Sequence, residues 1–310
     1  MSDVTAPFVG VIMGTYNQAN YISHALDGVL MQRGEFPVKI FLSDDGSTDG
    51  TREICQKYKE QHPDRIYLLM SEENTKGKIV ESLYDKCFSS GVKYVAMCEG
   101  DDYWTDPRKL IKQVELLESD LHLSVAIHSQ AVIFDGMEGQ NFVQGNIFCK
   151  KRVALEDVLA CFPCNFTASL LFRNPKTLPS WFYTTVSRDH ALLIWLATFG
   201  DIYFMDDVMA VYRQHPAGIT KTIAKKPFEE LIAVNERKTS FLVELDGYFN
   251  KKYSSIIRKH IFHQFEEALT LSRLHGRRFS AFRYWLKMLQ HDYARTVRMS
   301  VAFLIKRLHF

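Results

Sequence analysis

The chain has 310 residues, of which 46% are hydrophobic and 24% are charged. This composition is typical of a soluble globular protein, and no apolar run approaches the length of a membrane span. The net charge of +2 hides an asymmetry: residues 251–310 hold 13 Lys/Arg and 3 Asp/Glu (+10), which leaves 25 minus 33 (−8) for residues 1–250. The acidic balance of residues 1–250 favours metal binding, and the basic balance of residues 251–310 favours an anionic partner.

The six cysteines lack the spacing of a disulfide framework and lie mostly within apolar runs, which favours core packing. Residues 161–164 (CFPC) resemble a redox or zinc half-site, but no second pair accompanies them. The N-terminus lacks the basic and apolar segments of a secretion signal. We therefore expect a cytoplasmic protein with reduced cysteines.

Strands and helices alternate through the first part of the chain. A continuous apolar run at residues 8–13 is typical of a buried parallel strand, and the apolar spacing of residues 21–31 is helical. The same reading continues in order, with strands at 38–42, 65–70 and 93–97 and helices at 51–61, from 76–78 onward, and from Asp106-Pro107 to 117. The pattern predicts βαβ units and a parallel sheet.

Three polar, glycine-containing stretches follow predicted strands. They are residues 14–17 (GTYN), 43–51 (SDDGSTDGT) and 99–104 (EGDDYW). Ligands of open α/β sheets bind beyond the carboxyl ends of the strands. Because the ends of parallel strands share one edge, these stretches predict one binding site there.

The second half is more mixed. Strands are predicted at 125–128, 131–134, 168–172, 202–205 and 208–213, with helices at 155–161 and 189–199, and the pattern is helical from Pro227 onward. The domain boundary falls in 214–226. We therefore expect an α/β domain over residues 1–220 and a basic helical region over residues 221–310.

Asp101 and Asp102 lie in a tight loop between a buried strand and a helix. Successive residues of an extended chain point in opposite directions, so one carboxylate can bind a divalent cation while the other binds a sugar or ribose hydroxyl. Mg²⁺ or Mn²⁺ held by one or two carboxylates usually completes its shell with water and ligand phosphates. A nucleotide diphosphate fits that chemistry. The alternative is an ordinary turn whose Asp residues cap a helix.

The three strand-end stretches, followed by residues 188–190 (RDH) and 211–215 (VYRQH), resemble the family 2 inverting glycosyltransferases of the GT-A fold. The match covers roughly residues 7–220 in the family's order. The resemblance implies a Rossmann-like, mostly parallel sheet flanked by helices.

The resemblance also implies a donor-nucleotide site. Thr15, Tyr16 and Asn17 match the positions that hold the nucleotide, with the aromatic ring near the base, and Asp45 matches the acceptor of the base edge, usually uracil. Three further residues match positions near the diphosphate, ribose or sugar, namely Lys76, Asp101 and Arg213. For Lys76 and Arg213 a surface role is the alternative, and Asp49 is expected to cap the helix near Thr51.

Asp102 matches the direct ligand of Mn²⁺ or Mg²⁺ in the family's metal motif, and His215 matches a late histidine that approaches the metal or diphosphate. Imidazole suits Mn²⁺ better than Mg²⁺, and the metal neutralises charge on the departing diphosphate. A surface role is the alternative for His215.

Asp189 matches the catalytic base, which takes the proton of the acceptor hydroxyl during a single displacement. Its position at a helix start favours the ionised form, and helix capping is the alternative. Trp181, Phe182 and Tyr183 are either an acceptor platform or core. Residues 144–146 and 163–167, where acceptor recognition is expected, carry no family signature.

Residues 251–310 predict amphipathic helices with two apolar stripes, one at Ile256, Ile257, Ile261, Phe262 and Phe265 and one at Phe279, Phe282, Trp285, Leu286 and Leu289. Large aromatic residues opposite Lys/Arg are typical of helices that lie on anionic membranes, so we expect peripheral attachment to the inner face of the cell membrane. The alternative is a helical subdomain packed on the catalytic domain. No nucleic-acid motif is present.

The sequence thus predicts a metal-dependent inverting hexosyl- or N-acetylhexosaminyltransferase of surface polysaccharide biosynthesis. It would use a nucleotide-sugar donor, whose base the resemblance implies to be uracil. Its acceptor would be a glycan or a lipid-linked glycan. The alternatives are a nucleotidyltransferase, which would favour a Gly-rich basic loop after the first strand, and a non-catalytic module that binds sugar nucleotides or membranes.

Overall fold

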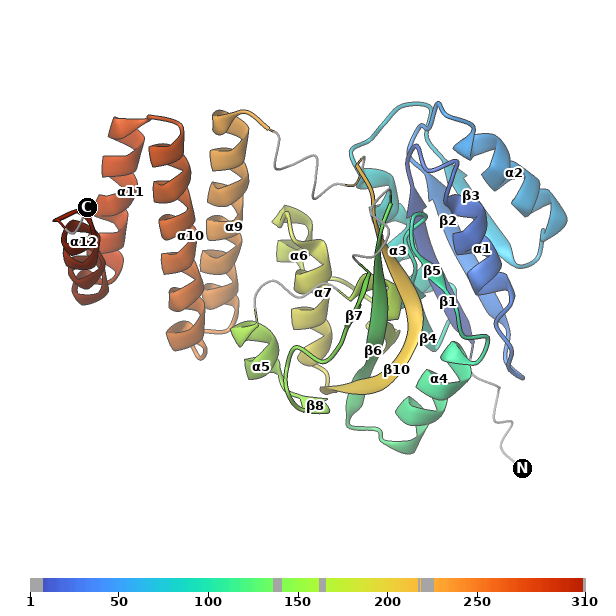
Figure 1. The fold of residues 1–310 in the computed structure, drawn as a ribbon. Helices are drawn as coiled ribbons and strands as arrows, with labels where there is room; N and C mark the ends of the chain where they lie inside the picture. The colour runs from blue at the N-terminus through green and yellow to red at the C-terminus, as the bar shows by residue number, and fades with distance from the viewer. Residues whose placement is uncertain (1–7, 136–140, 162–165, 217, 219–225, 309–310) are drawn as a thin grey trace. The chain divides into compact units, whose positions relative to one another are not determined.

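A computed structural model of the chain describes residues 8–135, 141–161, 166–216, 218 and 226–308. The chain packs into two compact units (Figure 1). The sheet unit comprises Met1–Leu178 and Leu192–His215, and the helical unit comprises Pro179–Ala191 and Pro216–Phe310. Three predicted features lie at least partly outside the described residues: Cys164, the acceptor residues 163–165 and the boundary residues 219–225.

Four parallel strands form the first half of the sheet in the order β3-β2-β1-β4. The strands are β1 (Val9–Thr15), β2 (Val38–Asp44), β3 (Ile66–Met70) and β4 (Tyr94–Met97). The connecting helices are α1 (Ile22–Leu30), α2 (Thr51–Gln61) and α3 (Lys78–Ser89). The predicted βαβ units are confirmed, and the carboxyl ends of β1, β2 and β4 share one edge.

The second half adds antiparallel strands to one long parallel pair. Strand β9 (Leu171–Arg173) is antiparallel to both β4 and β6 (Leu123–Phe134), and β6 is parallel to β10 (Asp201–Gln214). The remaining strands are β5 (Tyr103–Trp104), β7 (Phe142–Gln144) and β8 (Arg152–Val153). The remaining helices of this half are α4 (Lys109–Ser119), α5 (Leu155–Ala160) and the 3-10 turn η1 (Thr167–Ser169). The predicted α/β fold with a mostly parallel sheet is confirmed.

Two predicted strand pairs are each one continuous strand. We predicted an interruption at Ser129 and Gln130, but β6 runs through both residues, which are only 5% and 1% exposed. Strands β7 and β10 pair on either side of Gln130 and cover it. Strand β10 likewise passes Asp206 and Asp207, where a bulge shifts the register between Met205 and Val208. Polar residues inside these strands were misread as strand ends.

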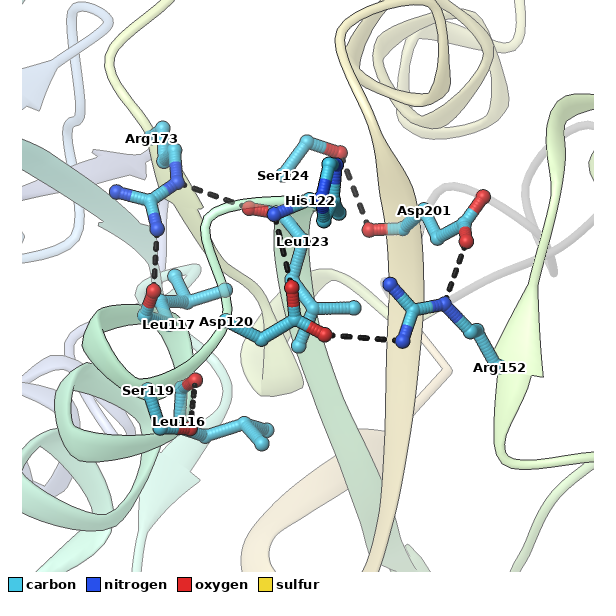
Figure 2. Close-up of polar contacts among 10 residues, drawn as sticks. All are labelled: Leu116, Leu117, Ser119, Asp120, His122, Leu123, Ser124, Arg152, Arg173 and Asp201. Carbon is cyan, nitrogen blue, oxygen red and sulfur yellow. Dashed lines mark hydrogen bonds and ion pairs between the residues drawn. The ribbon is translucent and has the colours of Figure 1, made fainter.

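An ion-pair network aligns the starts of β6 and β10 (Figure 2). Arg152 donates from Nη1 to Asp120 Oδ2 at 2.9 Å and from Nε to Asp201 Oδ2 at 2.6 Å. Arg173 donates from Nε to the carbonyl oxygen of Leu123 at 2.8 Å. Asp120 precedes β6, Leu123 and Asp201 are the first residues of β6 and β10, and the two arginines lie on β8 and β9. The contacts therefore tie the starts of the long parallel pair to neighbouring strands.

The buried cysteines confirm the core-packing prediction in part. Cys55, Cys87 and Cys98 are buried, Cys161 is half-buried and Cys149 is exposed. Burial raises the pKa of the Cys55 thiol to about 12. The buried thiols therefore stay protonated and pack as small apolar groups.

Five helices form most of the helical unit. They are α6 (Ser180–Thr184), α9 (Phe228–Tyr248), α10 (Ser254–Leu274), α11 (Arg278–His291) and α12 (Tyr293–Leu308). Helix α7 (Arg188–Ala197) begins in this unit and ends in the sheet unit. One core cluster consists of Ile232, Phe262, Ala268, Leu269, Tyr284 and Met288. None of the helices that the structure describes is both long and apolar enough to cross a membrane.

Trp181 and Phe182 are core residues of the helical unit. They are 1% and 0% exposed, and the Trp181 ring centroid lies 5.8 Å from that of Phe241 and 5.7 Å from that of Tyr248. Tyr183 is 38% exposed. Of the two predicted alternatives, core packing is therefore right for Trp181 and Phe182.

Candidate active site

The loop after β1 is tied to the loop after β2. Asn17 donates its backbone N–H to Ser47 Oγ at 2.9 Å and accepts the N–H of Thr48 on Oδ1 at 2.9 Å. Thr15 is buried and donates to Gln18 Oε1 at 2.8 Å, whereas the Tyr16 ring is 44% exposed. Of the three predicted nucleotide residues, Tyr16 presents an open aromatic face, and Asn17 holds the two loops together.

Asp45 organises the loop that precedes α3. Its Oδ1 accepts the N–H of Thr75 at 2.8 Å and the hydroxyl of Thr75 at 2.6 Å, and its Oδ2 accepts the N–H of Gly77 at 2.8 Å. Lys76 lies between these two residues, in a left-handed turn with φ 58°. The structure therefore brings the predicted residues Asp45 and Lys76 to the same place, through contacts that the sequence did not reveal.

Asp49 binds the start of α2, as predicted. Its Oδ1 accepts the N–H of Thr51 at 3.1 Å, although the residue at the N-cap position itself is Gly50. Its Oδ2 accepts the N–H of Ala19 at 3.1 Å. Burial acts to raise the pKa of Asp49, but these hydrogen bonds hold it below its usual value. The charged form is thus stabilised as part of the loop structure.

Gly100 allows the loop after β4 to approach the end of β1. Its N–H donates to the carbonyl of Gly14 at 3.1 Å. A Cβ at this position would lie 2.5 Å from Gln18 Oε1 and 2.8 Å from Thr15 Oγ1, which no side chain tolerates without a shift. Glycine therefore lets the loop that carries Asp101 and Asp102 pass this close to the end of β1.

Asp101 and Asp102 contact the end of β10. Asp102 is 1% exposed, and its Oδ1 accepts the N–H of Arg213 at 2.9 Å. Asp101 Oδ2 lies 3.0 Å from His215 Nε2. Four predicted site residues thus meet, although more than 110 positions separate the two Asp residues from Arg213 and His215.

Arg213 is a buried connector rather than a surface residue. Its Nη1 donates to the carbonyl oxygen of Asp101 at 2.6 Å, and its Cζ lies 4.7 Å and 5.0 Å from the ring centroids of Tyr21 and Tyr103. Its Nε lies 3.8 Å from Asp135 Oδ1. The guanidinium group therefore joins Asp101, Asp135 and the two aromatic rings. Arg213 itself is buried, although it does pair with a partly exposed acid.

Tyr21 and Asp135 also belong to this site, although neither was predicted as a site residue. The Tyr21 hydroxyl donates to Asp135 Oδ2 at 2.6 Å, and the Tyr21 ring centroid lies 4.8 Å from that of His215. Burial, followed by the hydrogen bond to Asp135, raises the pKa of Tyr21 to about 12. The two residues are 114 positions apart, and Asp135 reaches this place because β6 ends beside β10.

A cavity of ≈ 390 Å³ lies beside Tyr103 and Arg213. It is lined by residues of α1 and β5 together with Arg213, namely His24, Asp27, Gly28, Met31, Tyr103, Trp104 and Arg213. A Cβ on Gly28 would lie 2.9 Å from the backbone of Trp104, so a glycine is needed where α1 crosses β5. The cavity is large enough for a polar group of a small ligand beside Arg213.

Lys109 is fully buried behind the motif. Its Nζ donates to Gln113 Oε1 at 2.8 Å and lies 4.1 Å from the Trp104 ring centroid. Burial lowers the pKa of Lys109 to about 7, and the nearby Cys98 opposes this shift. Burial, followed by the charge of Lys109, also lowers the pKa of His128. The sequence placed Lys109 on a helix but gave no sign that it is buried.

Asp189 belongs to the helical unit, whereas the other predicted site residues belong to the sheet unit. It is the second residue of α7, in the first turn of that helix, as predicted. The next residue, His190, is 1% exposed, and burial lowers its pKa to about 3. His190 is therefore neutral at physiological pH.

The side chains of Asp101, Asp102 and His215 are of the kinds that bind a divalent cation. Among the described residues no group of three or more His, Cys, Asp or Glu could hold a metal ion on its own. Asp101 Oδ2 and His215 Nε2 are nevertheless only 3.0 Å apart, and Asp102 is the adjacent carboxylate. One or two carboxylates with an imidazole match Mn²⁺ or Mg²⁺ that completes its shell with phosphate oxygens and water.

A family model described as glycosyl transferase family 2 matches residues 10–176, more than half of the chain. An uncharacterized protein of Mycobacterium tuberculosis (strain H37Rv) is 33% identical over 214 residues, which cover 68% of this chain and 60% of the relative. The match thus spans about three fifths of the relative's length.

Solved structures share the fold at low sequence identity. The S. aureus TarS fragment 1–349 in complex with UDP-GlcNAc aligns with 94% of this chain and 83% of its own, with a TM-score of 0.63 and 16% identity. The mannosyltransferase PcManGT of Pyrobaculum calidifontis, in complex with GDP-Man and Mn²⁺, aligns with 98% of this chain and 83% of its own, with a TM-score of 0.51 and 16% identity. Both confirm the predicted GT-A type of fold.

Proposed function

Because the chain belongs to glycosyl transferase family 2, we propose that it moves a sugar from a nucleotide-diphosphate sugar to a glycan or lipid-linked glycan in surface polysaccharide biosynthesis. The observation that carries the proposal is the meeting of Asp101 and Asp102 with Arg213 and His215 at the carboxyl ends of the strands. This edge is where open α/β sheets bind their ligands. The catalytic domain is proposed to span residues 1–220.

The donor is proposed to be uridine-linked. The exposed Tyr16 ring is available to stack on the base, and Asp45 is proposed to accept a hydrogen bond from the base edge. Both Asp45 carboxylate oxygens already accept hydrogen bonds, one from Thr75 and one from Gly77. Binding of the sugar nucleotide therefore requires that one of these oxygens also accept a hydrogen bond from the base. Lys76, on the loop that Asp45 holds, is proposed to contact the ribose or diphosphate. The UDP-GlcNAc bound to TarS supports this choice, whereas PcManGT holds GDP-Man.

Asp102 and His215 are proposed to hold Mn²⁺ or Mg²⁺, with Asp101 beside them. When bound, the cation would neutralise the charge that develops on the departing diphosphate. Arg213 supports this loop in two ways: its backbone N–H donates to the Asp102 carboxylate, and its Nη1 donates to the backbone carbonyl of Asp101. The Mn²⁺ in the PcManGT complex supports metal use.

Asp189 is proposed to be the general base of an inverting single displacement. The acceptor oxygen forms a bond to the anomeric carbon as the bond from that carbon to the diphosphate oxygen breaks. The hydroxyl proton passes to the Asp189 carboxylate, and the bonding electrons leave with the nucleoside diphosphate. The first turn of α7 favours a negative charge at this position.

The protein is proposed to work in the cytoplasm, attached peripherally to the inner face of the cell membrane through residues 221–310. This location places it beside a lipid-linked acceptor. The basic charge of the region supports attachment to anionic lipids.

A thermal-shift screen tests the donor proposal. The full chain is heated with UDP, GDP and their sugars, each with and without Mn²⁺. Ligand that binds the folded state raises Tm, and we expect the largest rise with UDP or a UDP-sugar plus Mn²⁺. A rise with GDP alone would overturn the uridine assignment. A larger rise with UTP or GTP, heated in the same way, together with pyrophosphate release in a separate turnover assay, would replace the proposal with nucleotidyl transfer.

A further inference from the structure

Helix α11 carries an apolar stripe that its own unit does not cover. Phe279, Phe282 and Leu286 are 84%, 55% and 38% exposed. Their spacing of three and four residues puts them on one side of the helix. The Phe282 ring stacks on Trp285, with 6.0 Å between the ring centroids. The sequence predicted a stripe that also included Trp285 and Leu289. The structure leaves Phe279, Phe282 and Leu286 exposed, whereas Trp285 packs against the core cluster.

The opposite side of α11 is the one that joins the core. Tyr284 and Met288 are each 1% exposed and belong to the core cluster with Ile232 and Phe262. Burying them already anchors the helix. The stripe of Phe279, Phe282 and Leu286 is therefore not needed for packing within the unit, and three large apolar side chains in solvent indicate a surface that binds something.

Basic residues surround the stripe. Arg278 and Arg283 lie on its two flanks at helical spacing, and the exposed Leu274 and Tyr293 stand just before and just after the helix. Residues 273–310 hold nine Lys/Arg and one acidic residue, Asp292, a net charge of +8. Ion pairs with acidic residues of α9 and α10 offset part of this charge, namely Arg277 with Glu229 at 2.9 Å, Arg283 with Glu236 at 2.9 Å and Arg295 with Glu266 at 3.2 Å. The surface nevertheless combines apolar and cationic groups.

We propose that α11 lies in the interface of an anionic membrane, with Phe279, Phe282 and Leu286 inserted and Arg278 and Arg283 directed at lipid phosphates. A helix with aromatic residues between cations is suited to this position. A second copy of the chain is a poorer occupant, because symmetric pairing would bring two +8 segments together. The inference rests on the peripheral attachment proposed above and is independent of the transfer chemistry.

Vesicle co-sedimentation of the full chain tests the inference. Vesicles contain phosphatidylcholine alone or phosphatidylcholine with phosphatidylglycerol, at low and high salt. The triple variant Phe279→Ser/Phe282→Ser/Leu286→Ser should lose at least about tenfold in binding to the anionic vesicles. Arg278→Glu should lose about fivefold, and this loss should shrink at high salt.

The matched control is Leu121→Ser/Val243→Ser, which removes two side chains that are 77% and 58% exposed elsewhere. It should bind within about twofold of the parent, as expected for surface changes. An unchanged Tm for every variant verifies that folding is intact.

Three results would overturn the inference. If the parent does not bind anionic vesicles, peripheral attachment fails as well, while the donor screen is unaffected. If the parent binds and the triple variant binds equally, only the assignment to α11 fails. If light scattering shows that the triple variant converts a dimer to a monomer while vesicle binding is unchanged, the stripe serves a second copy.

Discussion

The sheet unit buries several polar side chains, whereas the helical unit exposes several large apolar ones. In the sheet unit polar groups are buried: Asp102, Arg213, His215 and Lys109 are 1%, 7%, 6% and 0% exposed. In the helical unit apolar groups are exposed along α11. Buried polar groups need partners, and they are held in fixed positions that suit a small polar ligand. An exposed apolar stripe among cations instead suits an extended surface. The difference predicts that substitutions in the two units affect different steps.

Asp189→Asn gives the largest expected effect. Removing the proposed base should lower transfer by about 10²–10⁴-fold while donor binding changes little. Single-turnover transfer and UDP-sugar titration measure the two quantities separately. The charge-matched control Asp64→Asn, at an exposed position of the sheet unit, should retain activity. Transfer within a few-fold of the parent would exclude Asp189 as the base.

Asp102→Ala comes next, and it acts on donor binding rather than on proton transfer. Loss of the proposed ligand should reduce Mn²⁺-dependent affinity for UDP by at least about 100-fold. Calorimetric titration with and without Mn²⁺ measures the change, and a parallel Asp101→Ala variant compares the two carboxylates. Full Mn²⁺-dependent affinity in Asp102→Ala would contradict the assignment and favour Asp101.

Arg213→Lys tests whether the Arg213 side chain positions the loop that carries Asp101 and Asp102. Lysine lacks the planar fork that reaches Asp101 while lying against Tyr21 and Tyr103. We expect apparent Mn²⁺ affinity to fall by about tenfold with a smaller change in kcat at saturating Mn²⁺. Arg33→Lys, at an exposed position, is the control and should leave both unchanged. Equal losses of kcat at all Mn²⁺ concentrations would show that Arg213 acts on the reaction itself.

Lys109→Met tests a separate property, the dependence of stability on pH. Burial lowers the pKa of Lys109 from 10.5 to about 7, so between these values the unfolded chain binds one more proton than the folded chain. This group therefore makes stability rise with pH across that window, by about 1.4 kcal/mol per pH unit.

The substitution should remove that rise in urea unfolding measured from pH 7 to pH 10. Lys57→Met, at an exposed position, should retain it. An identical pH profile for Lys109→Met and the parent would show that Lys109 keeps its ordinary pKa when folded.

The predicted parts of the site were those with a local signal. Polar residues directly after apolar runs located Tyr16, Asp45, Asp101 and Asp102 at strand ends, because the end of a buried strand is visible in the sequence. Tyr21 had no such signal, and Asp135, which directly follows the predicted strand at 131–134, was not linked to the site. Their contact depends on tertiary structure, because the pairing of β6 with β10 places Asp135 beside Gln214, whose carbonyl accepts the Asp135 N–H at 2.9 Å.

The sequence by itself determined the order of β1 to β4, the loops that follow them and the two apolar stripes of the basic helices, since hydrophobic periodicity is a local property. Tertiary structure decided that Arg213 and His215 reach Asp102 and Asp101, because these contacts join residues more than 110 positions apart in the sequence. It also decided that the stripe of Phe279 and Phe282 stays exposed. Periodicity marks a face as apolar, but only the neighbouring elements determine whether that face is covered.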